Sequence, residues 1–295
     1  MTFLTKHLQF SFLFRLIQVA AVAVFFGRAW QHLFWDAPFR TLLWDEALLS
    51  DIVYFPFGME WEAYITNPSI EKKMEQLIRG FGGFYALVGL TATFVRCLPR
   101  FFHHLLWIGS LGLAFLAFLY TKEKFYNVGQ FFEYSLQIGS PVLLWHLARQ
   151  ATTYSFSARF LLLLKVLTAL TFTCHGLYAV GYYPIPAYFI EMTMNILGTS
   201  ESTARQFLLV VGWLDFALSV GIFLPWKYAR FFLAYAVFWG FGTTIARIWA
   251  NFNWEWLDYV LWQWLHESVM RMPHFLIPLA VFFYYWKKEK TIHPA

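Results

Sequence analysis

The densest group of ionisable side chains in the sequence lies between His266 and His274. Within it, Glu267 and Arg271 are four residues apart, so the two can pair on one face of a helix. A carboxylate and imidazoles at this spacing could exchange protons with a bound molecule, because a buried carboxyl group keeps its proton more readily than one in water. The alternative is structural, since buried arginine–carboxylate pairs also hold helices together. The segment therefore predicts either a proton-transfer site or a helix clamp.

A further carboxylate, Glu133, holds the place in the first half of the chain that Glu267 holds in the second, and no arginine follows it. It is therefore the less neutralised carboxylate and the better candidate for proton transfer. We predict catalytic roles for four residues: Glu133, His266, Glu267 and His274. Six further ionisable residues in apolar surroundings are predicted to bind a ligand: Arg28, His32, His175, Asp215, Arg247 and Arg271. Of these, Arg28 and Arg247 suit an anionic or carbonyl group.

The histidines raise the question of a cofactor. His175 and His266 are predicted at similar depth, and two such histidines could ligate a haem b axially, although histidines on membrane helices more often hydrogen-bond a neighbour. We predict no metal site, because the sequence has no His-x-x-x-His or Glu-x-x-His spacing and no cysteine cluster. The cofactor is thus left open, with a quinone as the candidate that aromatic walls suit best.

The elements that position these residues must be membrane helices. Only 13% of the residues are charged while 59% are hydrophobic and 22% aromatic, whereas soluble domains are about a quarter charged. Several apolar stretches reach the roughly 20 residues that a bilayer core requires, and helices satisfy the backbone inside lipid. The sequence predicts an all-α integral membrane protein with eight transmembrane helices, at about 9–34, 75–96, 101–120, 128–149, 158–180, 204–225, 228–250 and 263–286.

The distribution of charge predicts the orientation. With the N-terminus inside, basic residues dominate the inner loops and termini, where Glu289 is the one acid, and most other acids fall outside. The positive-inside rule then gives both termini in the cytoplasm, and we expect a bacterial inner (plasma) membrane. The formal charge of +5 follows from these inner residues. It therefore needs no nucleic-acid partner to explain it.

The two halves of the chain repeat one pattern. Gly83-Phe84-Tyr85 is followed after seventeen residues by Arg100-Phe101-Phe102, and Gly212-Trp213-Leu214 is followed after eighteen by Arg230-Phe231-Phe232. We interpret this pattern as two parallel four-helix repeats, covering residues 10–150 and 158–287. Duplicated membrane halves usually place their polar site at the interface between the repeats.

Each repeat has a long extracytoplasmic loop after its first helix, residues 36–74 in one and 181–203 in the other. Asp36-Ala37-Pro38-Phe39 corresponds to Pro184-Ile185-Pro186, and residues 187–197 form an amphipathic stretch. We expect the two loops to fold as caps over an outer-leaflet polar pocket, or else to lie on the lipid headgroups.

Each half resembles the DoxX-like membrane families. The likeness is carried by Gly27-Arg28-Ala29-Trp30 and His175-Gly176-Leu177-Tyr178 at the ends of the first helices, by the Pro-containing loops, and by Gly83 and Gly212 in the second helices. The resemblance implies a four-helix unit, present here as a tandem duplication. Members of this wider group include subunits of thiosulfate:quinone oxidoreductase, so a link to quinone chemistry is what the resemblance implies.

Three functions from different classes follow. The leading hypothesis is a protein that binds a small amphiphile, a quinone or a membrane lipid, in the outer-leaflet pocket, as a component of a quinone-linked oxidoreductase. The second is a non-catalytic accessory subunit whose aromatic surface docks onto a larger membrane complex. A transporter comes third, because the sequence indicates no strongly broken helices at corresponding places in the two halves.

Overall fold

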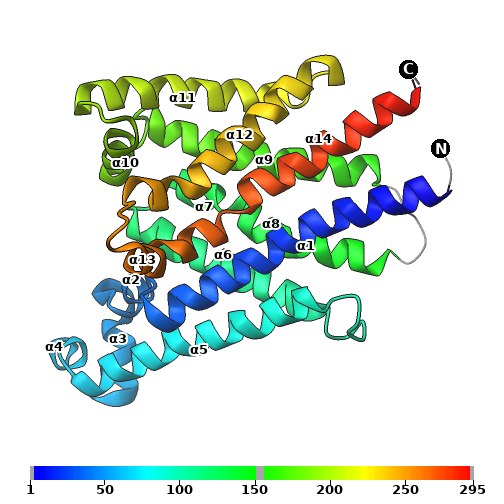
Figure 1. Ribbon diagram of the computed structural model, residues 1–295. Coiled ribbons are helices and arrows are strands. Elements are labelled where there is room, and N and C mark those ends of the chain that lie inside the picture. The colour runs from blue at the N-terminus through cyan, green and yellow to red at the C-terminus, as the bar shows by residue number, and fades with distance from the viewer. Residues whose placement is uncertain (1–2, 151–155, 293–295) are drawn as a thin grey trace.

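The computed structural model describes residues 3–150 and 156–292, which form fourteen helices and no strand. Five helices contain segments long and apolar enough to cross a bilayer: α1 (Phe3–Phe34, apolar from Phe10), α6 (His104–Glu123), α9 (Ala158–Ala179), α11 (Glu201–Gly221) and α12 (Trp226–Ala250). The predicted all-helical character is confirmed, and the apolar helices indicate a membrane protein (Figure 1).

Three of the eight predicted spans take a different form. α5 (Pro68–Thr93) is 26 residues long, but charged residues occupy its first turns. The predicted continuous helix 128–149 is wrong, because α7 (Val128–Glu133) ends before α8 (Ser135–Arg149) begins. The predicted helix 263–286 is likewise divided between α13 (Leu257–Met270) and α14 (Pro273–Ile292).

Each division has a physical cause. At Tyr134 ψ is 3°, and the N–H of Leu136 donates to Oγ1 of Thr171 on α9 at 3.2 Å instead of continuing the helical ladder. Pro273 has no N–H to donate, so it suits the start of a new helix better than a helix interior. Helices broken at corresponding places are therefore present, and the sequence-based argument against a transporter was wrong on this point.

Packing pairs recur between the two halves. α1 packs against α5 and α8, and α9 packs against α11 and α14. Across the halves, α1 contacts α13 while α9 contacts α7. The first helix of each half therefore touches the short helix that opens the last element of the other half. α1 begins and α14 ends at the same end of the bundle (Figure 1).

Two glycines allow close approaches between helices. A Cβ atom on Gly27 would lie 2.8 Å from the carbonyl oxygen of His266, and one on Gly240 would lie 2.5 Å from that of His274. Both distances are shorter than a real contact, so α1 can approach α13, and α12 can approach α14, only because these positions lack a side chain.

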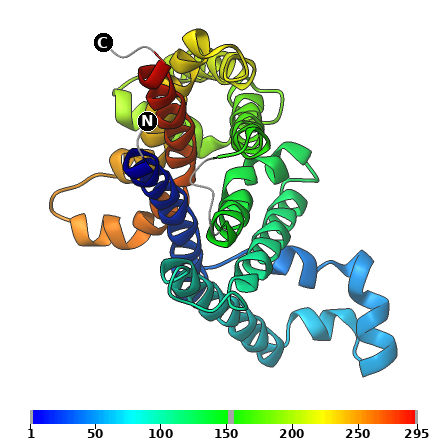
Figure 2. The same cartoon turned by 90° about the vertical axis from the view of Figure 1, so that its right-hand side faces the viewer.

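The two long loops fold into different structures. The first loop folds into α2 (Arg40–Leu43), α3 (Glu46–Phe57) and α4 (Trp61–Ile65), and α2–α4 project from the bundle as an arm (Figure 2). The second contains α10 (Ala187–Leu197), which matches the predicted amphipathic stretch and packs on α11 and α12. Of the two predicted caps, α10 covers the cavity described below, whereas the arm does not line it.

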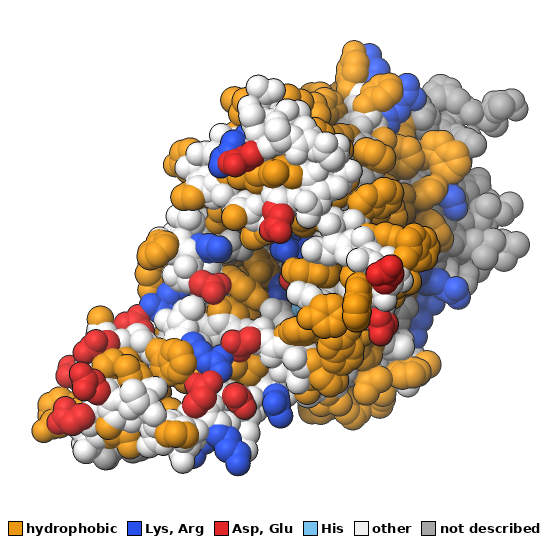
Figure 3. Space-filling model, turned by 60° about the vertical axis from the view of Figure 1, so that its left-hand side comes forward, with side chains coloured by type: hydrophobic (Ala, Val, Ile, Leu, Met, Phe, Trp, Pro, Cys, Tyr) orange, Lys and Arg blue, Asp and Glu red, His pale blue; other side chains and the backbone are white. Residues whose placement is uncertain are grey.

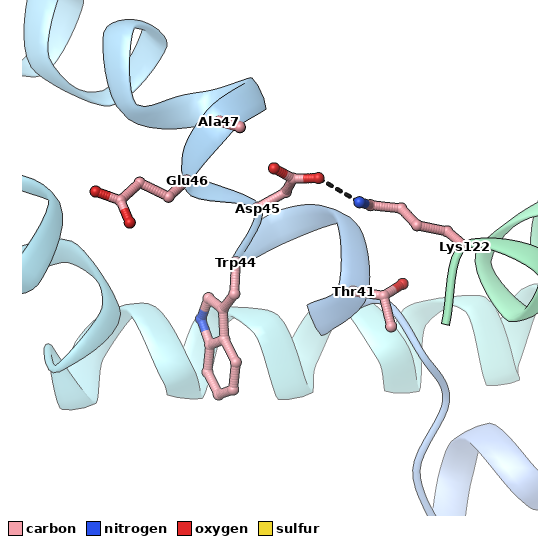
Figure 4. Close-up of a pocket in the computed structure, with 6 residues that line it drawn as sticks. All are labelled: Thr41, Trp44, Asp45, Glu46, Ala47 and Lys122. Carbon is pink, nitrogen blue, oxygen red and sulfur yellow. Dashed lines mark hydrogen bonds and ion pairs between the residues drawn. The ribbon is translucent and has the colours of Figure 1, made fainter. Parts of the chain in front are cut away.

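The arm is attached through ion pairs. Asp45 caps α3 and pairs with Lys122 of α6, and Figure 4 shows the two side chains pointing toward each other across an open hollow of about 580 Å³. Arg40 pairs with both Asp36 and Glu71, which joins α2 to α5. These contacts hold the loop to the first half, and acidic side chains gather on its surface (Figure 3).

Candidate functional site

The second half encloses an amphipathic cavity of about 470 Å³ between α9, α10, α11 and α12. Its walls are mainly apolar and aromatic, with α10 contributing one side. Half of the predicted site residues lie on its lining: Glu133, His175, Asp215, Arg247 and Arg271. The combination of a long apolar wall and a few converging polar groups is typical of a ligand site.

Glu133 and His175 form the contact that joins α7 to α9 at the cavity. Nε2 of His175 lies 3.1 Å from Oε1 of Glu133. The other carboxylate oxygen accepts from the Gln130 amide at 3.0 Å, and the Tyr178 hydroxyl donates to the Gln130 carbonyl oxygen at 3.2 Å. The carboxylate is therefore fixed in place from both sides by hydrogen bonds.

His274 extends this contact away from the cavity. Its ring stacks on that of His175, with ring centres 5.3 Å apart and planes 9° from parallel. Nδ1 of His274 donates to the carbonyl oxygen of Arg271 at 2.8 Å, so a neutral ring carries its proton on Nδ1. Glu133, His175 and His274 thus make a continuous row of titratable groups that begins at the cavity wall.

Glu267 sits between two arginines. Oε2 of Glu267 pairs with Arg247 and accepts from Nη1 of Arg271 at 3.1 Å, so the pairing predicted from the four-residue spacing is confirmed. The guanidinium carbon of Arg247 also lies 4.6 Å from the ring centre of Tyr188. Burial raises the pKa of Tyr188, on α10, to about 12, so its hydroxyl stays protonated at neutral pH. Both cations at the cavity are therefore already held by protein groups.

Asp215 is the remaining carboxyl group on the lining. It is 2% exposed, and the Tyr235 hydroxyl donates to its Oδ1 at 3.3 Å. No ion pair within residues 3–150 and 156–292 includes Asp215. It is thus a buried acid without a cation.

Arg28 lies apart from the cavity, in a second polar centre within the first half. It is 1% exposed, and its guanidinium donates to the carbonyl oxygens of Gln31 at 2.7 Å and Gln137 at 2.8 Å. The stacked rings of Tyr120 and Tyr134 lie 5.7 and 5.0 Å from the guanidinium carbon. These partners are all uncharged, and they fill the space around the cation.

His32 and His266 also lie off the cavity lining. Nδ1 of His32 contacts the carbonyl oxygen of Arg28 at 2.7 Å, and its ring packs edge-on against Tyr85. His266 stacks on Trp35 at 6.1 Å, whereas His175 contacts Glu133. The two histidines considered as haem ligands therefore have different neighbours. In the described part of the chain, no three His, Cys, Asp or Glu side chains are grouped to hold a metal ion.

Several residues that shape the site were not predicted. Gln130 and Tyr178 orient Glu133, and Tyr188 packs on Arg247. Neutral polar side chains of this kind give no signal in a search for charges within apolar segments. The amphipathic pattern of residues 187–197 was the one clue to the wall that Tyr188 belongs to.

Comparison with known proteins adds no relative. No family model, no curated protein and no solved structure matches the chain. The function must therefore be argued from the chemistry of the cavity.

Proposed function

We propose that this protein is an integral membrane protein that binds a small amphiphile, a quinone or a lipid, in the cavity between α9 and α12, as a component of a quinone-linked oxidoreductase. The observation that carries the proposal is the Glu133–His175 pair at the wall of an otherwise apolar cavity. An apolar wall accepts a tail or ring, while a hydrogen-bonded carboxylate and imidazole can take or return a proton.

The proposal includes eight membrane passes, arranged as two DoxX-like four-helix halves with both termini in the cytoplasm of a bacterial cell. The recurring packing of α1 with α5 and of α9 with α11 supports the duplication, as do the crossed contacts α1–α13 and α9–α7. In each half the last pass is then a broken helix, α7–α8 or α13–α14. An even number of passes agrees with α1 starting and α14 ending at one end of the bundle (Figure 1).

The residues divide into three roles. Glu133 and His175 exchange protons with the ligand, and His274 supports the imidazole of His175 by stacking on it. Arg271 and Arg247 present N–H donors at the cavity, and Glu267 keeps both guanidinium groups in place. Arg28, His32 and His266 stabilise the contact between α1 and its neighbours, since they lie outside the cavity lining.

Plugging the cavity tests the binding. A Cβ atom on Gly242 would meet nothing closer than 4.0 Å, so Gly242→Phe adds bulk at the lining without a backbone clash. We expect this change to weaken binding of a tritiated decyl-benzoquinone to protein in lipid nanodiscs at least about tenfold. Gly83→Phe on α5 is the matched control, because the space beside Gly83 is also open and it lies away from the cavity. Equal binding by both variants would remove the cavity from the proposal.

Glu133→Gln tests the proton role separately. The amide keeps the size of the side chain but cannot take a proton, so quinol oxidation by an electron acceptor added to the membranes should slow about a hundredfold while binding persists. If the variant turns over quinol as fast as the parent, the protein still binds the ligand but Glu133 does not exchange protons with it.

The arm gives a specific reason to keep the accessory-subunit alternative. Leu48, Ile52 and Phe55 of α3 form an exposed apolar stripe on the projecting arm. Extraction in a gentle detergent discriminates the two functions, because a docking subunit would co-purify with one constant partner in fixed ratio. A lone, stable protein that still binds the quinone would favour the first proposal.

A further inference from the structure

The charges around the cavity are unevenly satisfied. Arg247 and Arg271 share one carboxylate oxygen of Glu267, whose single negative charge offsets one of the two guanidinium charges. Two further carboxyl groups, Glu133 and Asp215, lie on the same lining. Three carboxyl groups therefore lie beside two guanidinium groups, so an anionic headgroup placed here would find no surplus cation, and like-charge contacts are costly in a medium of low dielectric constant.

Asp215 lies on the same lining as the proton-exchange pair. α9 and α11 meet where a Cβ atom on Gly176 would be 3.0 Å from the carbonyl oxygen of Gly212. His175 directly precedes Gly176, and Asp215 follows Gly212 by three residues, so both acid–base groups reach the cavity at neighbouring levels of the two helices. The cavity lining therefore has two polar sites, Glu133–His175 and Asp215.

Burial leaves the carboxyl group of Asp215 among uncharged neighbours. With the Tyr235 hydroxyl and the Trp239 indole as its polar neighbours, its carboxyl group is surrounded by uncharged side chains. A buried acid in such a place is stabilised by a hydrogen bond from a hydroxyl when it is ionised, or by donating to an oxygen when it is protonated. Either form suits an uncharged hydroxyl or carbonyl group.

We infer that the cavity selects an uncharged amphiphile carrying a hydroxyl or carbonyl group, which hydrogen-bonds to Asp215, and that it rejects anionic lipids. This inference rests on the proposed function and narrows its ligand class. It also revises the sequence-based expectation that Arg247 fixes an anionic group, because that guanidinium is held by Glu267.

A pair of ligands with equal chains tests the selection. Tritiated dodecanol is bound to the purified full-length protein in nanodiscs by scintillation proximity, and it is displaced with unlabelled dodecanol or with dodecyl sulfonate, which stays anionic. We expect the alcohol to displace at a concentration at least about tenfold lower than the sulfonate. Asp215→Leu should weaken binding of the alcohol about tenfold, through loss of one hydrogen bond in the apolar wall.

Two control variants keep the test decisive. Asp215→Asn retains a hydrogen-bond donor and an acceptor, so this variant should bind the alcohol about as well as the parent does. Its preference for the alcohol over the sulfonate should be smaller than the parent's. Asp258→Asn, at an exposed position, should change the binding of neither ligand. If the sulfonate displaces as well as the alcohol, or if Asp215→Leu binds like the parent, the inference is wrong although the cavity still binds. If Gly242→Phe leaves alcohol binding intact, the proposed cavity itself is wrong.

Discussion

The polar centre of the first half is filled, whereas that of the second half is hollow. In the first half, Phe39 inserts between α5 and α6, where its ring centre lies 4.9 Å from Phe81 and 6.0 Å from Phe115. In the second half, α10 lies across α11 and α12 and leaves a cavity of about 470 Å³ beneath it. Similar helices therefore enclose a packed core in one case and a ligand-sized space in the other.

One position of the loops accounts for part of this difference. When Pro38 is placed opposite Pro186, Phe39 stands opposite Ala187, so a 4% exposed aromatic plug in one half corresponds to a single methyl group in the other. The buried charged groups of the two halves also have different neighbours. Two nitrogens of the Arg28 guanidinium donate to side-chain amides, whereas the carboxyl group of Asp215 has no charged partner among the described residues. A filled centre stabilises a fold, whereas a hollow one has room for a ligand.

Removing the plug should make the first half resemble the second. Phe39→Ala deletes a buried ring, and we expect it to lower the free energy of unfolding by about 3 kcal/mol because the surrounding helices close only part of the cavity. Unfolding in mixed micelles measures the loss, and dodecanol should recover part of it by occupying the new space. Phe55→Ala on the exposed stripe is the control, with little expected change. A loss as small as the control's would mean that Phe39 does not plug this half.

A smaller loss of folding free energy is expected when Arg28, the buried cation of the first half, is replaced. Arg28→Met keeps the apolar stem but leaves the Gln31 and Gln137 oxygens without their donor, at a cost of about 1–3 kcal/mol. Binding at the cavity should not change, since Arg28 lies outside its lining. Arg79→Met provides an exposed arginine for comparison and should stay within about 0.5 kcal/mol of the parent. Loss of ligand binding in Arg28→Met, with stability unchanged, would contradict the division between the two centres.

The sequence predicted the helical class and the amphipathic α10 because both depend on local pattern. It did not predict the end of α7, since the N–H of Leu136 is taken by Thr171, a residue 35 positions away on another helix. The break before Pro273 had a local signal, but a proline within a span is also compatible with a kinked continuous helix.

The site was predicted in the same uneven way. Charges in apolar stretches pointed to Glu133, His175 and Asp215, which do line the cavity. The same rule also selected Arg28, because sequence spacing does not reveal that Tyr120 and Tyr134, from two other elements, enclose its guanidinium. Whether a buried charge is satisfied by protein or open to a ligand depends on tertiary packing, and the roles of these residues in catalysis stay predictions.

The weakest expected effect concerns the arm, where the loops of the two halves differ most. The hydrogen bond from Lys122 holds the pKa of Asp45 below its usual value. A carboxyl group with a lowered pKa in the folded state stabilises attachment fully above its ordinary pKa, and this contribution is lost as the pH falls through the lowered value. Hydrogen exchange in α3, corrected for the intrinsic exchange rate at each pH, should therefore show less protection in acid. Because Arg40 also pairs with Asp36 and Glu71, Lys122→Met is the variant that isolates the Asp45 contribution: it should loosen α3 at neutral pH and flatten the acid response. Asp51→Asn, on the exposed side of α3, should leave the response intact, and an unchanged profile in Lys122→Met would show that the arm is held by other contacts.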